Sequence, residues 1–300
     1  MKTRTKVFLG IGGVIALGIA LAAFFPSQGR NSEFKPQGEF ELLPWIHLEV
    51  GGVDMSITKG VLYLAIACLL TTVTMVYIAK RMQDKPNRVQ TAVEWAYNFA
   101  SDQIAGANLK DPKMMAKWFP FIAALFFFIL FSNMIGYIPL PVNTEHPLHI
   151  FGLEVPALAI YAATANLSIP LVLTLLVWFS YHSEGVRTHG FRAYLKGWVP
   201  SGVTGAARIP LFVIEVISQF VRIISLSVRL FANLLAGHLL ILFMGGGLVV
   251  ILGTAAIGAF TLPVAILFFM FEVGLIAGLQ AFIFATLTAI YLGEATAESH

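Results

Sequence analysis

Residues 209–252 read IPLFVIEVISQFVRIISLSVRLFANLLAGHLLILFMGGGLVVIL, and this stretch decides how the chain folds. It is long and apolar enough to lie in a membrane, yet it carries Glu215, Arg222, Arg229 and His238. Charged groups at the centre of a membrane cost about 2.5–3.5 kcal/mol each on insertion scales, so they mark functional sites by default. We therefore expect the rest of the chain to be a frame that holds this stretch in place.

The composition is that of a polytopic α-helical membrane protein. Of the 300 residues, 58% are hydrophobic and only 12% are charged, whereas soluble domains average about 25% charged. Mean hydropathy is +0.81, and the apolar residues form long runs rather than the short alternating segments of a membrane β-barrel. The pI near 9.0 reflects Lys and Arg in the connecting loops, where they set orientation, so it does not indicate nucleic-acid binding. The single cysteine, Cys68, lies in an apolar run and is expected to be a packing residue.

The first 26 residues fit two interpretations. A basic start with Lys2, Arg4 and Lys6 precedes an apolar run of about 19 residues, which suits both a cleaved signal peptide and an uncleaved membrane anchor. In both cases the basic end stays in the cytoplasm. The polar segment 27–59 then emerges on the extracytoplasmic side, and it is expected to have no core of its own.

Five further apolar runs are predicted to be membrane-embedded helices of one helical domain, 60–294. Basic residues gather in the loops after the first and third runs, while the loop 142–155 has acids but no Lys or Arg; the positive-inside rule then places the C-terminus in the cytoplasm. Between the first two runs, 87–117 is expected to be an amphipathic cytoplasmic helix and linker. The predicted membrane helices are 60–79, 118–138, 157–181, 209–252 and 261–292.

The last two of these helices are too long to stand upright. The final run, 261–292, would measure about 48 Å as a helix at about 1.5 Å per residue, and 209–252 would be longer. Because the hydrocarbon core is roughly 30 Å thick, both helices must tilt strongly. A short connector joins them, so we expect a slanted hairpin.

Polar side chains fall on one stripe of the long helix. At about 100° per residue they lie within about 40° of Arg229, among residues that are otherwise mostly Ile, Leu, Val and Phe, whereas His238 falls at about 180°. Such a stripe is expected to face protein or water rather than lipid. Its members are Glu215, Ser218, Arg222, Ser225, Arg229 and Asn233.

Purely structural interpretations stay open for several of these groups. Arg222 lies two turns from Glu215 on the stripe, so the two side chains can form an internal ion pair. Arg229 then has no acid nearby on its own helix, and Glu272 in the last helix is its remaining partner at membrane depth. A buried neutral imidazole, or interhelical hydrogen bonds that average about 0.6 kcal/mol, would account for the other polar groups. These are His238, Asn233 and Gln280.

Three segments resemble motifs of subunit a of F-type ATP synthases. SLSVRLFANLLAGH at 225–238 resembles the family signature, LQAFIFATLTAIYL at 279–292 is similar to the last helix of the family, and FSNMIGYIP at 131–139 is similar to its second-helix motif. The motifs occur in the right order, and the resemblance covers about residues 40–294. The ending GEA at 293–295 is similar to cyanobacterial and chloroplast members.

The resemblance implies a proton-translocating stator subunit in the membrane sector of the ATP synthase, in the inner membrane of a bacterial cell. Its partners would be the ring of c subunits, the peripheral-stalk b subunits and the lipid bilayer. The last two helices would form their hairpin against the ring.

The resemblance also assigns roles to single residues. Arg229 would face the carboxylate of each passing ring subunit, between two offset half-channels. His238 matches a titratable position of the extracytoplasmic half-channel. Independently of the resemblance, Arg222, as a partner of Glu215, and Asn133 are expected to be structural. The polar positions around the arginine and along the route to the cytoplasm are matched by Asn233, Gln280, Glu215 and Ser225.

One position departs from the family pattern. Many members have an acid or a histidine seven residues before the glutamine, but here that position is Val273 and the acid, Glu272, comes one residue earlier. On a regular helix this offset turns the side chain by about 100°. A local bulge would restore the alignment, so Glu272 is a candidate for the half-channel role.

Elementary electrostatics supports the same mechanism. A guanidinium cannot release its proton, so arginine cannot relay protons, but it favours the ionised form of a nearby carboxylate. Histidine, with a reference pKa of about 6.5, can load and release protons near neutral pH. Moving one charge through the membrane potential is worth about 2.3 kcal/mol per 100 mV, and this is the energy that a rotor would capture.

Two other classes of protein make different predictions. A secondary transporter with an Arg–Glu gate predicts repeated topology with broken helices in matching halves, and the sequence shows no repeat. A scaffold that only anchors partner helices predicts that replacing Arg229 leaves ion flux intact. The sequence lacks a phosphate-binding loop, so we expect this chain to have no catalytic site for ATP and no bound nucleotide. No cofactor, metal or nucleic acid is expected either.

Overall fold

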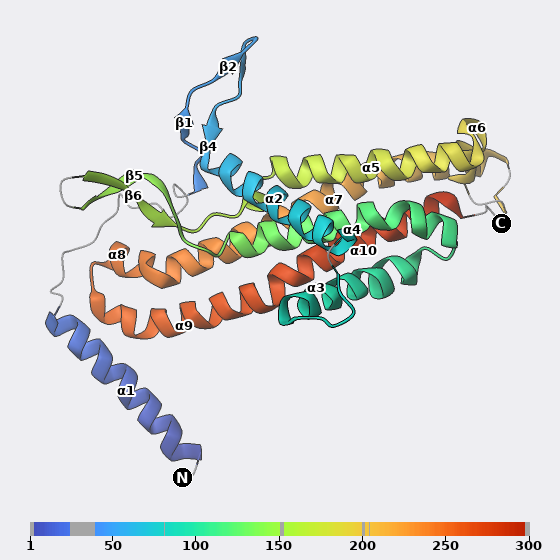
Figure 1. Cartoon of the computed structure of the whole chain (residues 1–300). Helices are drawn as coiled ribbons and strands as arrows, with labels where there is room; N and C mark the ends of the chain where they lie inside the picture. Colours follow the sequence, from blue (N-terminus) through green and yellow to red (C-terminus); the bar gives the residue numbers. More distant parts are fainter. Residues whose placement is uncertain are drawn as a thin grey trace. The chain divides into compact units, whose positions relative to one another are not determined.

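The computed structural model of the chain is built mainly from helices (Figure 1). It describes residues 3–24, 40–80, 82–150, 153–199, 202–203 and 205–297. Among these residues, five helical stretches are long and apolar enough to cross a membrane, which confirms the predicted all-α polytopic fold. The five stretches are Lys59–Lys80, Pro112–Ile135, Ser168–His189, Gly205–Leu252 and Ala255–Thr296.

The chain divides into two compact units, each with its own internal contacts. The long helix α7 (Arg208–Leu242) contributes residues to both units. The first unit takes Met1–Lys59, Tyr137–Tyr161 and Leu234–Ile276, and the second takes Gly60–Gly136, Ala162–Asn233 and Ala277–His300.

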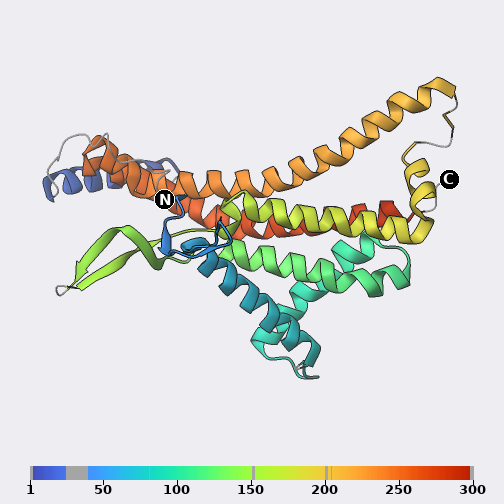
Figure 2. The ribbon, with the colours of Figure 1, turned by 90° about the horizontal axis from the view of Figure 1, so that it is seen from above.

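The second unit has a core of three helices. In it, α10 (Ala277–Thr296) packs against both α4 (Pro112–Ile135) and α5 (Ser168–His189) (Figure 2). Every fourth residue of the first part of α10 is a fully buried alanine. Small residues at this spacing let helix backbones approach closely in a membrane, where close packing replaces the hydrophobic effect as the driving force. The buried alanines are Ala277, Ala281, Ala285 and Ala289.

An ion pair also joins α4 to α5. Lys117 Nζ lies 2.6 Å from Glu184 Oε2, and the Glu184 side chain is only 5% exposed. A buried carboxylate is destabilising without a partner, so the lysine keeps this carboxylate compatible with the helix contact.

The ends of α4 differ from the predicted 118–138. The helix begins earlier, at Pro112, because Asp111 caps it by accepting a hydrogen bond from the Lys113 backbone N–H and the proline occupies the first turn. It ends at Ile135 and is followed by Gly136. The apolar pattern located the helix but did not include its polar first turn.

The third helix begins later than the predicted 157. Residues Leu153–Ala159 form β6, which pairs antiparallel with β5 (Leu140–Ile150) in the segment predicted to be a loop. Helix α5 starts only at Ser168, where the Asn166 side chain accepts a hydrogen bond from the Ser168 backbone N–H. The apolar residues before Asn166 were therefore wrongly joined to the helix that follows.

The helices before α4 lie close to where the sequence predicts them. Helix α2 spans Lys59–Lys80, close to the predicted 60–79. The predicted amphipathic segment contains α3 (Arg88–Asn98), capped by the Asn87 side chain, and the π-helix η2 (Phe99–Gly106), which contacts both α3 and α4.

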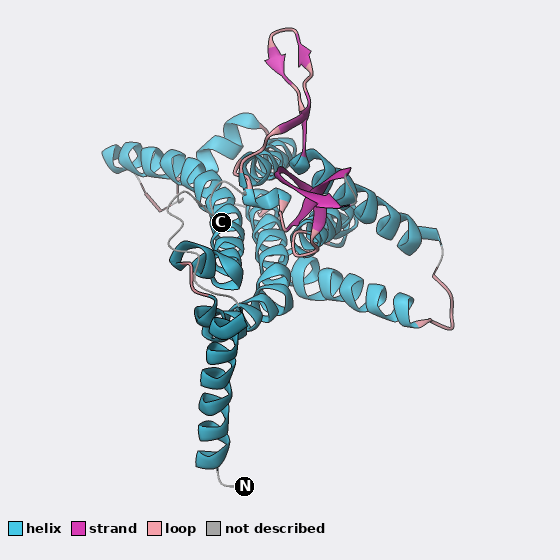
Figure 3. Cartoon of the chain, turned by 90° about the vertical axis from the view of Figure 1, so that its left-hand side faces the viewer, coloured by secondary structure: helices cyan, strands magenta, loops and turns pink. Residues whose placement is uncertain are grey.

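The first unit carries all the strands of the described chain, as three two-stranded antiparallel pairs (Figure 3). Besides β5–β6, β1 (Pro44–Ile46) pairs with β4 (Ile57–Thr58), and β2 (Glu49–Val50) pairs with β3 (Val53–Asp54). Gly51 and Gly52 connect β2 to β3 with φ of 61° and 82°, as a two-residue hairpin turn requires. Strands β1 to β4 fall in the predicted extracytoplasmic segment 27–59, of which 27–39 lie outside the described residues.

The Asp54 carboxylate fixes the end of this hairpin. Its pKa is lowered because it accepts hydrogen bonds from Ser56, including one of 2.9 Å from the Ser56 backbone N–H. The carboxylate is fully exposed to solvent, so its interactions organise the turn rather than a core.

Helices complete the first unit. After α7 come the π-helix η5 (Phe243–Gly247) and α8 (Leu248–Leu252), and the chain reverses at Gly253, whose φ of 66° suits glycine. Then follow η6 (Ala255–Ile257), α9 (Gly258–Phe271), which packs against η5, and the π-helix η7 (Glu272–Ile276). Helix α1 (Thr3–Phe24) packs against η6 and α9. Both interpretations of residues 1–26 predict α1.

Candidate functional site

Three polar side chains of α7 form an exposed row. Ser225, Arg229 and Asn233 are all exposed, whereas Leu226 and Leu230 between them are buried. Arg229 Nη2 lies 3.4 Å from Ser225 Oγ, a weak contact for a guanidinium. The stripe predicted for this helix thus turns its central charge away from the hydrophobic core of its own chain.

Arg222 has a different partner from the one considered above. Its Nη1 lies 3.0 Å from Glu294 Oε2, and its guanidinium carbon lies 4.7 Å from the centre of the Tyr291 ring. Both partners belong to α10. The internal pair with Glu215 is therefore not formed, because an acid on a neighbouring helix takes the guanidinium.

Glu215 instead ends a chain of hydrogen bonds. Gln219 Nε2 donates to Glu215 Oε1 at 2.6 Å, and Tyr181 Oη donates to Gln219 Oε1 at 2.7 Å. Tyr181 comes from α5 and the other two residues from α7. A carboxylate, an amide and a phenol thus lie in line within the second unit.

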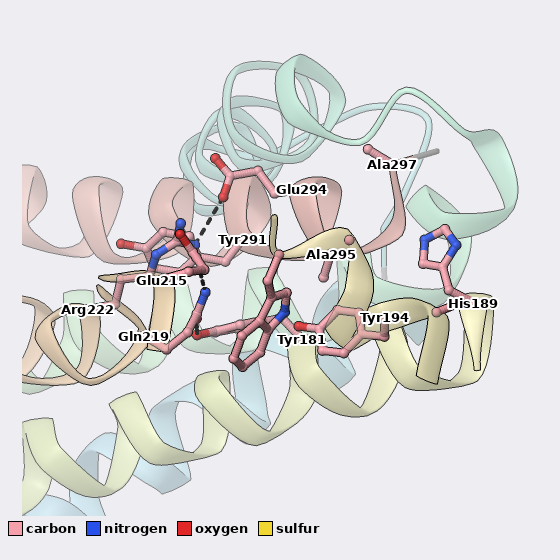
Figure 4. A pocket seen from close by; sticks show the side chains of 13 residues that line it. Tyr181, His189, Tyr194, Glu215, Gln219, Arg222, Tyr291, Glu294, Ala295 and Ala297 are labelled. Atoms are coloured by element: carbon pink, nitrogen blue, oxygen red, sulfur yellow. Dashed lines mark hydrogen bonds and ion pairs between the residues drawn. The ribbon is translucent and has the colours of Figure 1, made fainter. Parts of the chain in front are cut away.

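A cavity of about 350 Å³ opens beside these groups (Figure 4). It collects polar and aromatic side chains from α5, α6 (Phe191–Gly197), α7 and α10. A cavity of this size and polarity has room for several waters. Its polar and aromatic lining consists of Tyr181, His189, Tyr194, Trp198, Glu215, Gln219, Arg222, Tyr291 and Glu294.

One wall of this cavity is fixed by an aromatic pair. Tyr194 Oη lies 2.7 Å from His182 Nδ1, and the two rings meet edge to face. Burial raises the pKa of Tyr194, so this phenol keeps its proton throughout the physiological range. Tyr194 therefore contributes a neutral hydroxyl rather than a charge to the cavity.

A second group of polar side chains gathers in the first unit, and we call it the Tyr137–His238–Glu272 cluster. His238 is fully buried, its ring stacks on the Tyr137 ring with centroids 4.5 Å apart, and its Nδ1 lies 3.0 Å from the Leu234 carbonyl oxygen. Tyr137 Oη donates a 3.0 Å hydrogen bond to Glu272 Oε2. The phenol therefore contacts both titratable groups that the sequence singled out near this end of the two long helices.

Close backbone approach makes room for the Glu272 carboxyl group. A Cβ added at Gly237 would overlap all three atoms of that carboxyl group. Only glycine at position 237, the residue before His238, therefore leaves the buried Glu272 carboxyl group in its present position.

A π-helical turn begins at the acid that departs from the family pattern. It occupies Glu272–Ile276, directly after the regular helix α9. A π turn accommodates one extra residue in a helix, and such turns are frequent at functional sites. This turn is the kind of local bulge that the one-residue offset between Val273 and Glu272 led us to consider.

Of the three amide residues predicted to matter from the sequence, Asn233 is exposed, whereas Asn133 and Gln280 are buried in the second unit. Asn133 Nδ2 donates to the Ala277 carbonyl oxygen at 3.2 Å, and Asn133 Oδ1 accepts a 2.8 Å hydrogen bond from Thr164 Oγ1. The first bond joins α4 to α10 and the second joins α4 to the short helix η3 (Ala163–Ala165), which suits a structural role for Asn133. Gln280 lies on α10 and is 4% exposed.

Several members of the two groups were not singled out from the sequence. Tyr137 lies inside the quoted motif FSNMIGYIP and Glu294 inside the ending GEA, so both carried a signal that was not used. Tyr291, which contacts Arg222 through its ring, likewise lies inside the quoted motif LQAFIFATLTAIYL. The hydrogen-bond partners Tyr181 and Gln219 carried no signal, because only the packing of separate helices brings them to the cavity. Among the described residues, no group of three or more His, Cys, Asp or Glu is placed to hold a metal ion.

Comparison with known proteins gives one consistent result. The family described as ATP synthase A chain matches residues 61–293. A protein named ATP synthase subunit a from Hyphomonas neptunium is 33% identical over 272 residues, which is 88% of this chain and 97% of that protein. Proteins with the same name are 33% identical in Rubrobacter xylanophilus (82% of this chain, 87% of that protein) and 35% identical in Brucella ovis (88% and 98%).

Proposed function

Because the chain belongs to the ATP synthase subunit a family, a proton-translocating component of the membrane sector, we propose that it supplies two offset half-channels and the arginine that faces a carboxylate on a ring of c subunits. Proton flow through these half-channels would turn the ring and drive ATP synthesis elsewhere in the complex. In this proposal the chain has no catalytic site of its own.

The exposed row on α7 carries this proposal. Arg229 lies in the middle of a helix long and apolar enough to cross a membrane, yet its side chain is exposed in the isolated chain. An arginine at membrane depth needs a partner or water, because leaving it in lipid is costly. A carboxylate on a neighbouring subunit satisfies that need, and Ser225 and Asn233 on the same face add hydrogen-bonding groups around it.

The chemistry of the pair follows from two properties of arginine. Its guanidinium stays charged, so it favours the ionised form of an approaching carboxylate and promotes release of the proton from that carboxylate. The same fixed charge repels a proton that would pass directly from one half-channel to the other. Gln280, buried on α10, is proposed to complete the polar surroundings of the arginine.

The Tyr137–His238–Glu272 cluster is proposed as the extracytoplasmic half-channel. It combines an imidazole, which titrates near neutral pH, with a carboxyl group, a second group that can accept and release a proton. The Tyr137 side chain contacts both groups, because its hydroxyl donates to the carboxyl group and its ring stacks on the imidazole. The strand hairpins of the same unit would then lie on the extracytoplasmic side.

The cavity of the second unit is proposed as the cytoplasmic half-channel. Glu215 would exchange protons with water there, and Gln219 and Tyr181 hold its carboxyl group in place. Ser225 would mark the path from the exposed row toward this cavity. The C-terminus, at the end of α10, would lie on the cytoplasmic side of a bacterial inner membrane, with the peripheral-stalk b subunits as further partners.

Replacing His238 with alanine tests the outer half-channel. A positioned proton-transfer group contributes about 10²–10⁴-fold, and water can replace part of that, so we expect passive proton flow through the reconstituted membrane sector to slow by about tenfold or more. The measurement is potential-driven proton uptake into vesicles. Exposed His47, replaced by alanine, is the matched control and should leave the flow unchanged. Unchanged flow in an assembled His238→Ala complex would reduce His238 to a packing residue.

A further inference from the structure

We propose that Glu294 is a positioning residue for the cytoplasmic half-channel. In this proposal Glu294 holds the Arg222 guanidinium on the cavity wall, and so keeps Arg222 from forming an ion pair with Glu215. The inference rests on the proposed function and deepens it, since it concerns how the inner proton route is kept open. Ser225 and Arg229 play no part in it.

Arg222 is held from two directions by α10. Glu294 Oε2 lies 3.0 Å from Nη1, and the Tyr291 ring lies under the guanidinium with its centre 4.7 Å from the central carbon (Figure 4). A guanidinium can bind a carboxylate through its edge and stack on an aromatic ring through its face at the same time. The two contacts together define one position for Arg222 at the cavity.

Glu215 is the competitor for this guanidinium. Among the described residues that line the cavity, the acids are Glu215 and Glu294. Glu215 precedes Arg222 by about two turns of α7, so both side chains project from the same face of the helix. If Glu294 lost its charge, Glu215 would be the remaining carboxylate within the lining for Arg222 to pair with.

Such a change of partner would close the route. At present Glu215 accepts a 2.6 Å hydrogen bond from Gln219, whose own carbonyl oxygen accepts from Tyr181. An ion pair with Arg222 would hold Glu215 as a carboxylate and draw it out of this chain. The residue would then no longer exchange a proton with the water of the cavity.

The test uses the assembled membrane sector in vesicles and measures potential-driven proton flow. Glu294→Gln keeps the shape of the side chain but removes its charge, and we expect flow to slow about fivefold, which corresponds to about 1 kcal/mol of competing ion pairing. Adding Arg222→Gln to Glu294→Gln should restore most of the flow, because Glu215 is released again. Arg222→Gln alone should not be slower than the wild type, and Glu294→Asp should keep most of the flow.

Two results would overturn the inference. One is wild-type flow in assembled Glu294→Gln; the other is a double variant as slow as Glu294→Gln, because a merely structural role for Glu294 would give no rescue. If Glu294→Gln fails to assemble, slow flow in Arg222→Gln alone contradicts the inference by itself. Exposed Asp102, replaced by asparagine, controls for the loss of an acid. Glu215→Gln in the same preparation distinguishes failure of this inference from failure of the proposed function. Normal flow in Glu215→Gln would reject the proposed cytoplasmic half-channel itself.

Discussion

Replacing Arg229 with alanine is expected to abolish ATP synthesis driven by a proton gradient while the complex still assembles. A guanidinium about 4 Å from a carboxylate contributes roughly 4 kcal/mol at an effective dielectric constant of about 20, and this corresponds to about a 10³-fold effect on release of the proton. The exposed side chain makes only a weak contact within its own chain, to Ser225, so its loss should leave the fold intact. The measurement is ATP synthesis by reconstituted complexes at a fixed gradient.

Two variants sharpen this result. Arg229→Lys keeps the positive charge but loses the planar fork of donors, so we expect it to block proton leakage yet restore little synthesis. Arg222→Gln removes an arginine from the same helix whose partners, Glu294 and Tyr291, lie within the chain, and it should leave synthesis largely unaffected. Wild-type synthesis by an assembled Arg229→Ala complex would favour the scaffold interpretation.

Replacing Gly237 with alanine is expected to have the second largest effect. The added methyl group would overlap the Glu272 carboxyl group, which is buried and hydrogen-bonded to Tyr137, so the carboxyl group must leave its position. The overlapped atoms are the end of a flexible side chain, so the carboxyl group can move while the surrounding helices stay in place. We expect proton flow to slow by about tenfold or more, as for the loss of a positioned proton-transfer group, while the Tm of the purified chain stays close to that of the wild type.

The same site offers a rescue and a control. Glu272→Asp shortens the side chain by one methylene, so combining it with Gly237→Ala should make room for the methyl group and recover part of the flow. Gly245 has no atom within 4 Å of an added Cβ, and Gly245→Ala should be neutral in both measurements. Normal flow in Gly237→Ala would show that the position of the Glu272 carboxyl group does not matter, which contradicts its proposed place in the outer half-channel.

Hydropathy located the membrane helices well because apolar length is a property of the local sequence. The helices α2 and α4 follow from it, and the error at the start of α4 arises from polar capping by Asp111, which an apolar window does not detect. The error before α5 has another cause. The apolar residues around Ala157 continue a strand of the β5–β6 pair, and short apolar runs do not distinguish strand from helix.

The site was predictable only in part, for a comparable reason. The stripe on α7 follows from helical periodicity, so the exposure of Arg229 and Asn233 on one face could be anticipated. The partner of Arg222 could not be predicted, because Glu294 lies on a separate helix, α10, and reaches Arg222 only in the folded chain. The family pattern suggested a bulge near Glu272, but the helix propensities of the residues did not place it at Glu272–Ile276.

Disulfide cross-linking to the ring shows directly whether the exposed row on α7 meets the ring carboxylate. Cys68 is the only cysteine of the chain, so Cys68→Ser gives a clean background. A disulfide requires Cα atoms within about 7 Å, so Asn233→Cys should cross-link to a cysteine placed beside the ring carboxylate and block rotation. Ser227→Cys, on the same helix but buried, should not. Cross-linking from Ser227→Cys, or none from Asn233→Cys in an assembled complex, would contradict the account.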